Sequence, residues 1–503
     1  MMDTLGSNNI TNNSNNNNLF YSVWRNIFLR DLVRVKVFVN TKKRISFDDL
    51  ETNNPLVSLT NEDKLKHNIF LESFIFDQED FENYVKNPYR HVLNSIHFNS
   101  SVYTPPQQYD DEEEEAQEQE EEQGGVEEIK ELDLQCIHQG VHCVSFDIKT
   151  NSKPCQGFLP DSVTQVSISE MDGECNTQFI NSIIHSLPSG LKSLSIPEEY
   201  KFTSPYVMND TLHTLQYRST HDSMQWLVRS PNKVLDACTL EIKAKEEYAW
   251  LGNNKWITSA AVIRSMGDLC SNIVPQHVVK LSIEYDDAVI QPDAFPKKLE
   301  LLKCTHPIRF DKNVLPYSNL THITLKYYFE KLEKDILPCS LEHLKIGHFE
   351  QPLDQVGVFP QGLKTLVLKK FDHPFHPFVL PQGLQILNMP HFKQPFIQAN
   401  VLPPSLLHLE MQLFSGSFES GSAPLDNLQL LTVDALDASI SLLLTNVVKL
   451  RIWTLNGFKK GTSLYNTSIQ DLFLYSYERV SVNQSSLPQH LKKFRADGLD
   501  IDQ

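Results

Sequence analysis

The sequence has few features of a disulfide-bonded, metal-binding or membrane protein. Its eight cysteines lie between residues 136 and 339 without a CxxC pair or a regular spacing. This pattern indicates reduced thiols inside a core rather than a disulfide framework or a zinc site. No apolar run is long enough to cross a bilayer. Basic residues form no stripe along the sequence, so we expect neither a membrane nor a nucleic acid as partner.

The sequence also lacks the motifs of an enzyme. It contains no phosphate-binding glycine loop, nucleophile elbow or metalloprotease helix. His373 and His376 come closest to a metal-ligand pair, but the prolines beside them preclude the helix that would align them, and no third ligand follows. We therefore expect a non-enzymatic protein without metal or cofactor. An enzyme is the alternative from a different functional class.

The N-terminus lacks the basic and apolar stretches of a secretory signal, so we expect an intracellular, cytoplasmic protein. Residues 1–18 are polar and rich in asparagine. They are predicted to form a disordered, low-complexity tail.

Negative charge is concentrated in one segment. The formal net charge is −18, yet residues 110–128 hold twelve acidic residues and no basic one, which leaves only −6 for the rest of the chain. Such a run repels itself and buries no apolar surface, so residues 104–128 are predicted to be a disordered loop. A role in binding a basic partner is the alternative for this loop.

What the sequence does contain is a repeat of 21 or 22 residues. It is clearest from Pro338, which is followed by Leu341, Leu344 and Ile346 at the third, sixth and eighth positions beyond the proline. Three further units keep these positions: Pro360 with Leu363, Leu366 and Leu368; Pro381 with Leu384, Leu387 and Met389; and Pro403 with Leu406, Leu409 and Met411. The same frame recurs at Pro160, Pro188, Pro275, Pro296 and Pro488, and without the proline at His138, Asn209, Leu444 and Asn466. A pattern that recurs at one period predicts a solenoid of stacked coils.

Each position of the repeat has a physical reason. Leu344 and Ile346 are two residues apart, so both point to the core when the chain is extended. The proline before them fixes its own φ and makes a rigid corner. Phe349 and its counterparts one and two repeats later can fill the coil opposite the strand, and a proline three residues beyond each prevents a regular helix. The sequence therefore predicts, over residues 129–503, a β-rich repeat solenoid of roughly fifteen to seventeen coils, with one long parallel sheet and an irregular convex side.

These units resemble FNIP repeats, which are relatives of leucine-rich repeats and are named for a Phe-Asn-Ile-Pro-type signature. The resemblance is carried by residues 337–353 and by the neighbouring units that end at Phe375 and Phe396, and it covers about residues 138–496. It implies a leucine-rich-repeat-like solenoid that binds partner proteins and has no catalytic activity.

Residues 19–86 follow a different pattern. Apolar residues recur at helical spacing over residues 19–32, and residues 64–76 and 77–86 are also predicted to be helical. We therefore expect a small helical N-terminal module. It either caps the end of the solenoid or is an F-box-like segment that docks a ubiquitin-ligase adaptor. Residues 19–26 resemble the openings of other FNIP proteins.

Two more segments need separate interpretation. A first solenoid strand is expected within residues 87–103, where Ile96 and Phe98 fit the repeat frame. Residues 235–274 hold either one degraded repeat or an inserted helix, which we place at residues 259–273.

A partner-binding surface is predicted near the C-terminus. Side chains that alternate with the buried positions face away from the core, and here they are aromatic and basic: Arg451, Trp453, Phe473, Tyr475 and Arg495. Because Trp, Tyr and Arg are enriched in binding hot spots, these five are the candidate partner-binding residues. The alternatives are that a C-terminal extension covers them or that the register is shifted by one, which would place the aromatic residues in the core.

The partner is expected to be a protein whose identity the sequence does not give. The chain would then be either the substrate-recognition subunit of a ubiquitin ligase or a scaffold or signalling protein without a ligase.

Overall fold

The chain divides into two compact units, each of which is described by itself. Unit 1 comprises Met1–Ser219 and Gln225–Ala237, and unit 2 comprises Thr220–Met224 and Cys238–Gln503. The computed structural model describes residues 39–52, 59–104, 131–231, 233–265, 269, 272–286, 288–312, 314–316, 319–419, 425–435, 439, 444, 446–453, 463–483 and 487–502. The predicted tail at 1–18, the predicted helix at 19–32 and the acidic run at 110–128 lie outside these residues.

Unit 1 is built mainly from parallel strands. Its strands are β1 (Lys42–Arg44), β2 (Phe70–Ile75), β3 (Ser95–Phe98), β4 (Cys143–Ile148), β5 (Gln165–Glu170), β6 (Ser193–Ser195), β7 (Tyr206–Val207), β8 (Thr214–Ser219) and β9 (Leu227–Val228). Its helices are α3 (Phe47–Thr52), α5 (Asn61–Lys66), α6 (Gln78–Lys86) and α7 (Thr177–His185), with single 3-10 turns at Arg90–Val92, Ser100–Val102 and Leu134–Cys136. Neighbouring strands pair in parallel from β1 to β6 and on to β8, and β7 pairs with β9.

Unit 2 continues the same architecture, and strand β10 (Leu235–Ile242) spans the boundary between the units. Its helices are α8 (His221–Met224) and α9 (Glu246–Asn253), and its first strands are β11 (Ile257–Val262), β12 (Lys280–Ile283), β13 (Leu301–Cys304), β14 (His322–Tyr327), β15 (His343–His348), β16 (Thr365–Leu368) and β17 (Ile386–Asn388). The later strands are β18 (Phe396–Ile397), β19 (His408–Met411), β20 (Ser417–Phe418), β21 (Leu430–Val433), β22 (Lys449–Ile452), β23 (Asp471–Asn483) and β24 (Lys493–Asp502). All these strands pair in parallel in chain order, except that β18 and β20 form a separate pair.

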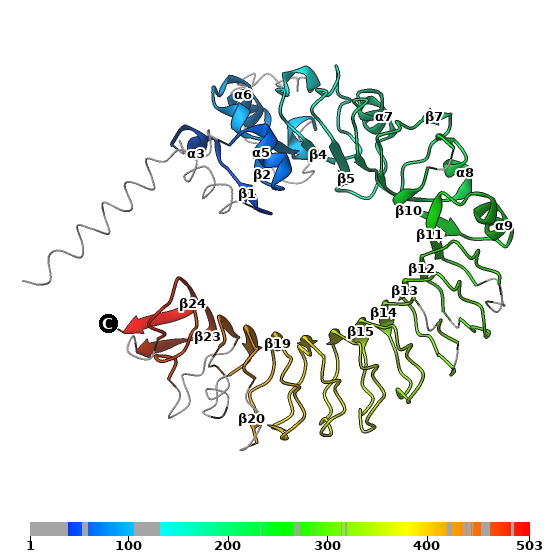
Figure 1. Ribbon diagram of the computed structural model, residues 1–503. Helices are drawn as coiled ribbons and strands as arrows, with labels where there is room; N and C mark the ends of the chain where they lie inside the picture. The colour runs from blue at the N-terminus through cyan, green and yellow to red at the C-terminus, as the bar shows by residue number, and fades with distance from the viewer. Residues whose placement is uncertain are drawn as a thin grey trace, which may run out of the picture. The chain divides into compact units, whose positions relative to one another are not determined.

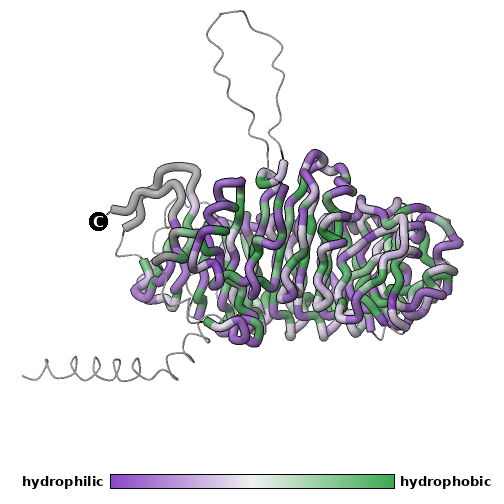
Figure 2. The backbone as a smooth tube through the Cα atoms, turned by 90° about the horizontal axis from the view of Figure 1, so that it is seen from above, coloured by the Kyte–Doolittle hydropathy of each residue, from purple (hydrophilic) through white to green (hydrophobic). Residues whose placement is uncertain are grey.

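The register of neighbouring strands confirms the predicted repeat frame. Leu344 pairs with Leu366, Leu366 with Leu387, and Leu387 with Leu409, so one leucine per coil joins a continuous buried row. Figure 1 shows these strands side by side as successive rungs, and Figure 2 shows apolar and polar segments alternating along the stacked turns. The chain is a parallel β-solenoid of about sixteen turns with few helices, as the repeat predicts.

In most of the repeats that have the proline, the corner before the strand is a β-turn that begins at this proline. The carbonyl of Pro338 accepts the N–H of Leu341, and that of Pro360 accepts the N–H of Leu363, both at 3.1 Å. Proline suits this place because its ring fixes its own φ and favours an extended conformation in the residue before it, and because its nitrogen has no hydrogen to satisfy. The proline therefore sets the direction in which the next strand leaves the corner.

A row of phenylalanines fills the coils opposite the strands, as predicted. We call Phe349, Phe371, Phe392 and Phe414 the phenylalanine ladder. Each of these side chains is at most 1% exposed. Successive rings are stacked, with centroids 6.0, 6.3 and 5.9 Å apart. The ladder links consecutive coils along the side of the core that the sheet does not cover.

The predicted helix at residues 64–76 is wrong beyond its first part. Helix α5 ends at Lys66, and Phe70–Ile75 forms β2, which pairs with β3. Leu71 and Ile75 are fully buried on the sheet, and an apolar run this short is compatible with either a helix or a strand. The described part of residues 19–86 therefore contributes two strands to the sheet of unit 1 besides its helices.

Residues 235–274 contain both a repeat and a helix. The helix is α9 at Glu246–Asn253, and the helix predicted at 259–273 is wrong in its first part, since Ile257–Val262 forms β11. Strand β11 pairs with β12 in the regular register, with Ala260 opposite Leu281. Stacking against β12 decides the conformation of a segment whose own sequence is ambiguous.

Candidate functional site

The side chains between the buried positions form the exposed side of the sheet. Within each unit, the strands lie on the inner side of the curve of the chain and the connecting loops on its outer side (Figure 1). We call this exposed side of the sheet the concave face. Its side chains recur once per coil at about 4.8 Å, so residues one repeat apart in the sequence become neighbours.

The aromatic residues singled out near the C-terminus lie together on the concave face of unit 2. The ring of Trp453 is 5.8 Å from that of Phe473, edge to face, and 6.1 Å from that of Tyr475. All three side chains are half-buried, whereas Leu450 and Leu472 on the core side of the same strands are fully buried. The strands thus have the register that the repeat frame predicts. We call Trp453, Phe473 and Tyr475 the aromatic cluster.

Two arginines flank the aromatic cluster. Arg451 is the register partner of Phe473, and Phe473 is the register partner of Arg495. Both arginines are exposed. Half-buried rings beside a guanidinium can contact a partner through apolar area, ring stacking and ion pairing. The structure therefore brings all five candidate residues together, and their role in binding stays a prediction.

Two polar atoms at this end of unit 2, Thr432 Oγ1 and Trp453 Nε1, have no hydrogen-bond partner among the described residues. Thr432 is 1% exposed and is the register partner of Arg451. An unpaired buried polar group costs about 1–3 kcal/mol. Burying these two polar atoms therefore carries a cost in folding stability.

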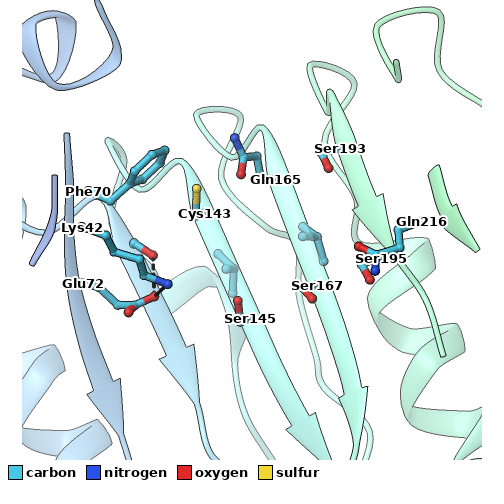
Figure 3. Close-up of a pocket in the computed structure, with 13 residues that line it drawn as sticks. Lys42, Phe70, Glu72, Cys143, Ser145, Gln165, Ser167, Ser193, Ser195 and Gln216 are labelled. Carbon is cyan, nitrogen blue, oxygen red and sulfur yellow. Dashed lines mark hydrogen bonds and ion pairs between the residues drawn. The ribbon is translucent and has the colours of Figure 1, made fainter. Parts of the chain in front are cut away.

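A groove crosses the concave face of unit 1 from β1 to β8 (Figure 3). Its volume is about 280 Å³. Much of its lining consists of hydroxyl and amide side chains: Ser95, Ser145, Gln165, Ser167, Ser193, Ser195 and Gln216. The groove is hard to recognise in the sequence because its lining comes from several coils, each about one repeat from the next. A small or polar residue at the seventh position of successive repeats is the signal that would have revealed it.

One end of the groove holds an ion pair between the exposed Lys42 and the buried Glu72. Lys42 Nζ lies 2.7 Å from Glu72 Oε1, and the Ser95 hydroxyl donates to the same oxygen at 3.2 Å. Cys143 lies beside this pair, and burial raises the pKa of its thiol to about 12, while Lys42 lowers it and Glu72 raises it. The thiol is protonated at neutral pH, so Cys143 is a poor nucleophile.

The groove does not contain a hydrolytic triad. His97 Nε2 lies 2.7 Å from Asp147 Oδ2, and His97 is the register partner of Ser145. A serine hydrolase needs the serine hydroxyl bonded to the other imidazole nitrogen, and no hydrogen bond joins Ser145 to His97. The Asp147 carboxylate therefore orients the His97 ring.

Within the described ranges, no group of three or more His, Cys, Asp or Glu side chains could hold a metal ion. The helices that the structure describes are all too short or too polar to cross a membrane.

The absence of a basic stripe, inferred from the sequence, is wrong for the folded chain. Five exposed lysines occupy the concave face of consecutive coils in unit 2, from β12 to the residue after β16: Lys280, Lys303, Lys326, Lys345 and Lys369. We call them the lysine strip. They are 19 to 24 residues apart in the sequence, so no local cluster reveals them. Reading the fifth, seventh and ninth positions of each repeat would have found them. The expectation that no nucleic acid is bound stays a prediction.

Solved structures similar to this chain include the following three. CroV588, titled a novel circular LRR protein, is 16% identical with a TM-score of 0.35; the match covers 85% of this chain but only 58% of that one. The mouse RP105/MD-1 complex is 14% identical with a TM-score of 0.43, covering 72% and 80% of the two chains. YopM from Yersinia enterocolitica WA-314 is 14% identical with a TM-score of 0.30, covering 72% and 87%.

The family comparison matches the middle of unit 2. The FNIP Repeat family model matches residues 306–349, 349–392 and 371–414, whereas no curated protein matches the chain. These ranges include the clearest repeats, with their prolines, buried leucine row and phenylalanine ladder. Residues 306–414 are therefore FNIP repeats within the parallel solenoid.

Proposed function

We propose that this repeat scaffold recognises a partner protein through the aromatic cluster and the two arginines beside it. The observation that carries the proposal is the half-buried group of Trp453, Phe473 and Tyr475 on the concave face, flanked by exposed Arg451 and Arg495. Aromatic rings bury a large area on binding at a small cost in side-chain entropy. Residues of these types dominate the binding energy of protein interfaces.

The proposal is tested by capturing partners with the full-length chain and with the double variant Arg451→Ala/Phe473→Ala. Hot-spot residues contribute about 2 kcal/mol or more, so the variant should retain a specific partner about 30-fold less strongly. Its melting temperature should remain close to that of the wild type, because Arg451 is exposed and Phe473 is half-buried. Bound proteins are quantified by mass spectrometry, and melting is followed by circular dichroism.

The matched control is Arg309→Ala/Phe329→Ala, which removes the same residue types elsewhere in unit 2. Arg309 is exposed and Phe329 is 50% exposed. Equal loss of partner with both double variants would contradict the proposal. If the Arg451→Ala/Phe473→Ala variant instead unfolds, these side chains belong to the core and the proposed surface is wrong.

The second candidate is a substrate-recognition subunit of a ubiquitin ligase, supported by the resemblance of residues 19–26 to the openings of other FNIP proteins. Deleting residues 19–38 tests it while leaving β1 and its pairing with β2 in place. Adaptor and cullin subunits that co-purify with the full chain and disappear with the deletion would support the ligase role. Their absence from both preparations would leave a scaffold or signalling protein without a ligase.

A further inference from the structure

We propose that the lysine strip of unit 2 binds an acidic, extended segment of a partner protein. This inference shares the general function proposed above, protein recognition, but rests on different residues. Lys280, Lys303, Lys326, Lys345 and Lys369 lie on five consecutive coils. Four strand spacings of about 4.8 Å give the strip a length of roughly 19 Å. That length matches about six residues of an extended peptide.

The lysines of the strip differ from other lysines of unit 2 in their ion pairing, and Lys326 Nζ contacts the Tyr327 ring, 5.3 Å from its centroid. Other lysines of unit 2 make ion pairs: Lys243 with Glu241, Lys312 with Glu333, Lys331 with Asp354 and Lys364 with Glu342. By contrast, no strip lysine forms an ion pair with a residue that the structure describes. Five unpaired positive charges on one surface raise the local electrostatic potential, which attracts an anionic partner.

Gly347 leaves an opening in the middle of the strip. It lies between Lys326 on the preceding strand and Lys369 on the following one, two residues beyond Lys345. A Cβ atom at this position would be 2.6 Å from the backbone oxygen of Lys326, so the close approach of β14 and β15 requires glycine. Without a side chain at Gly347, a carboxylate of a bound peptide can approach three lysines at once.

An acidic peptide fits this surface better than a nucleic acid does. The strip contains no arginine, and the aromatic cluster, whose rings could stack on bases, lies four and five strands beyond β16, at β22 and β23. Proteins that bind single strands combine basic grooves with aromatic stacking platforms. The net charge of −18 also repels a long polyanion, because such a molecule extends beyond the strip. A short acidic segment stays close to the five lysines, and charges farther away are screened by salt.

The test is the binding of a fluorescein-labelled hexaglutamate peptide to the full chain, measured by fluorescence anisotropy. We expect binding at about 50 mM NaCl that weakens strongly at about 500 mM, because the interaction is between exposed charges. The triple variant Lys326→Glu/Lys345→Glu/Lys369→Glu should bind at least tenfold more weakly, since each reversal removes an attraction and adds a repulsion. Hexaglutamine should not bind.

The matched control is Lys297→Glu/Lys298→Glu/Lys334→Glu, which changes the net charge by the same amount at exposed positions outside the strip. This control should keep most of the affinity. Equal weakening in both triple variants would show a general charge effect and overturn the proposal, as would no binding to the wild type at low salt. Tighter binding of a labelled hexauridylate RNA through the same three lysines would replace it with a nucleic-acid site. The aromatic cluster is intact in both variants. A negative result with the peptide therefore does not bear on the partner-capture experiment, which tests the proposed function separately.

Discussion

Replacing Phe371 by alanine is expected to lower the free energy of unfolding by about 3–5 kcal/mol. Phe371 is fully buried, and its ring stacks on Phe349 at 6.0 Å and on Phe392 at 6.3 Å. The substitution would therefore remove apolar contacts in two neighbouring interfaces between coils and leave a cavity that the rigid stack cannot close. The change is measured as a shift of the urea unfolding curve followed by circular dichroism.

Phe378→Ala is the matched control, seven residues further along the chain. This phenylalanine is 57% exposed, and its positive φ of 63° is no easier for phenylalanine than for alanine. Its replacement should change the free energy of unfolding by less than about 0.5 kcal/mol. If both variants unfold at the same urea concentration, the phenylalanine ladder does not hold the coils together.

Replacing Lys64 by methionine is expected to stabilise unit 1 by about 1–2 kcal/mol at pH 7. Lys64 is 1% exposed, and its Nζ donates to the Val92 carbonyl at 2.7 Å and to Asn61 Oδ1 at 3.2 Å. Burial lowers the pKa of this amine to about 8, so folding at neutral pH places a charge where it is less favourable than in water. Methionine removes this cost, and the loss of the bond to the Val92 carbonyl offsets part of the gain.

The stabilisation should depend on pH in a defined window. Because the pKa of Lys64 in the folded state lies below its ordinary value of 10.5, the unfolded chain binds more protons between about pH 8 and 10.5. The cost of burying the charge is complete below pH 8 and disappears as the pH rises through this range. The advantage of Lys64→Met over the wild type should therefore shrink towards pH 10, whereas Lys66→Met, at an exposed position of the same helix, should show no such trend. If the stability difference between Lys64→Met and the wild type stays constant with pH, the lowered pKa of Lys64 is contradicted.

The repeat frame could be predicted because each coil has the same local sequence pattern. A proline that starts a turn, two apolar residues two positions apart and a later phenylalanine are all readable within one repeat, as Pro338, Leu344 and Phe349 illustrate. Stacking then follows, because a single coil cannot bury its own apolar side. The aromatic cluster could also be predicted from the sequence, because Trp453 and Phe473 occupy defined positions in two adjacent repeats.

The errors arose where neighbours in space decide the outcome. Phe70–Ile75 and Ile257–Val262 are short, mainly apolar segments that suit a helix or a strand, and pairing with β3 and β12 selects the strand. The lysine strip and the serine-lined groove depend on side chains a full repeat apart, so neither composition nor a local window could reveal them. Both surfaces become visible only once the register between coils is known.

The coil-by-coil pairing of unit 2 has a consequence for how such proteins can evolve. Each coil contacts mainly its two neighbours, so duplication or loss of one 21- or 22-residue segment between β16 and β22 would leave the flanking coils intact. The separation of the lysine strip and the aromatic cluster would change by one strand spacing, about 4.8 Å. Unequal recombination between repeats can therefore adjust the distance between two binding surfaces in discrete steps, without any substitution in either surface.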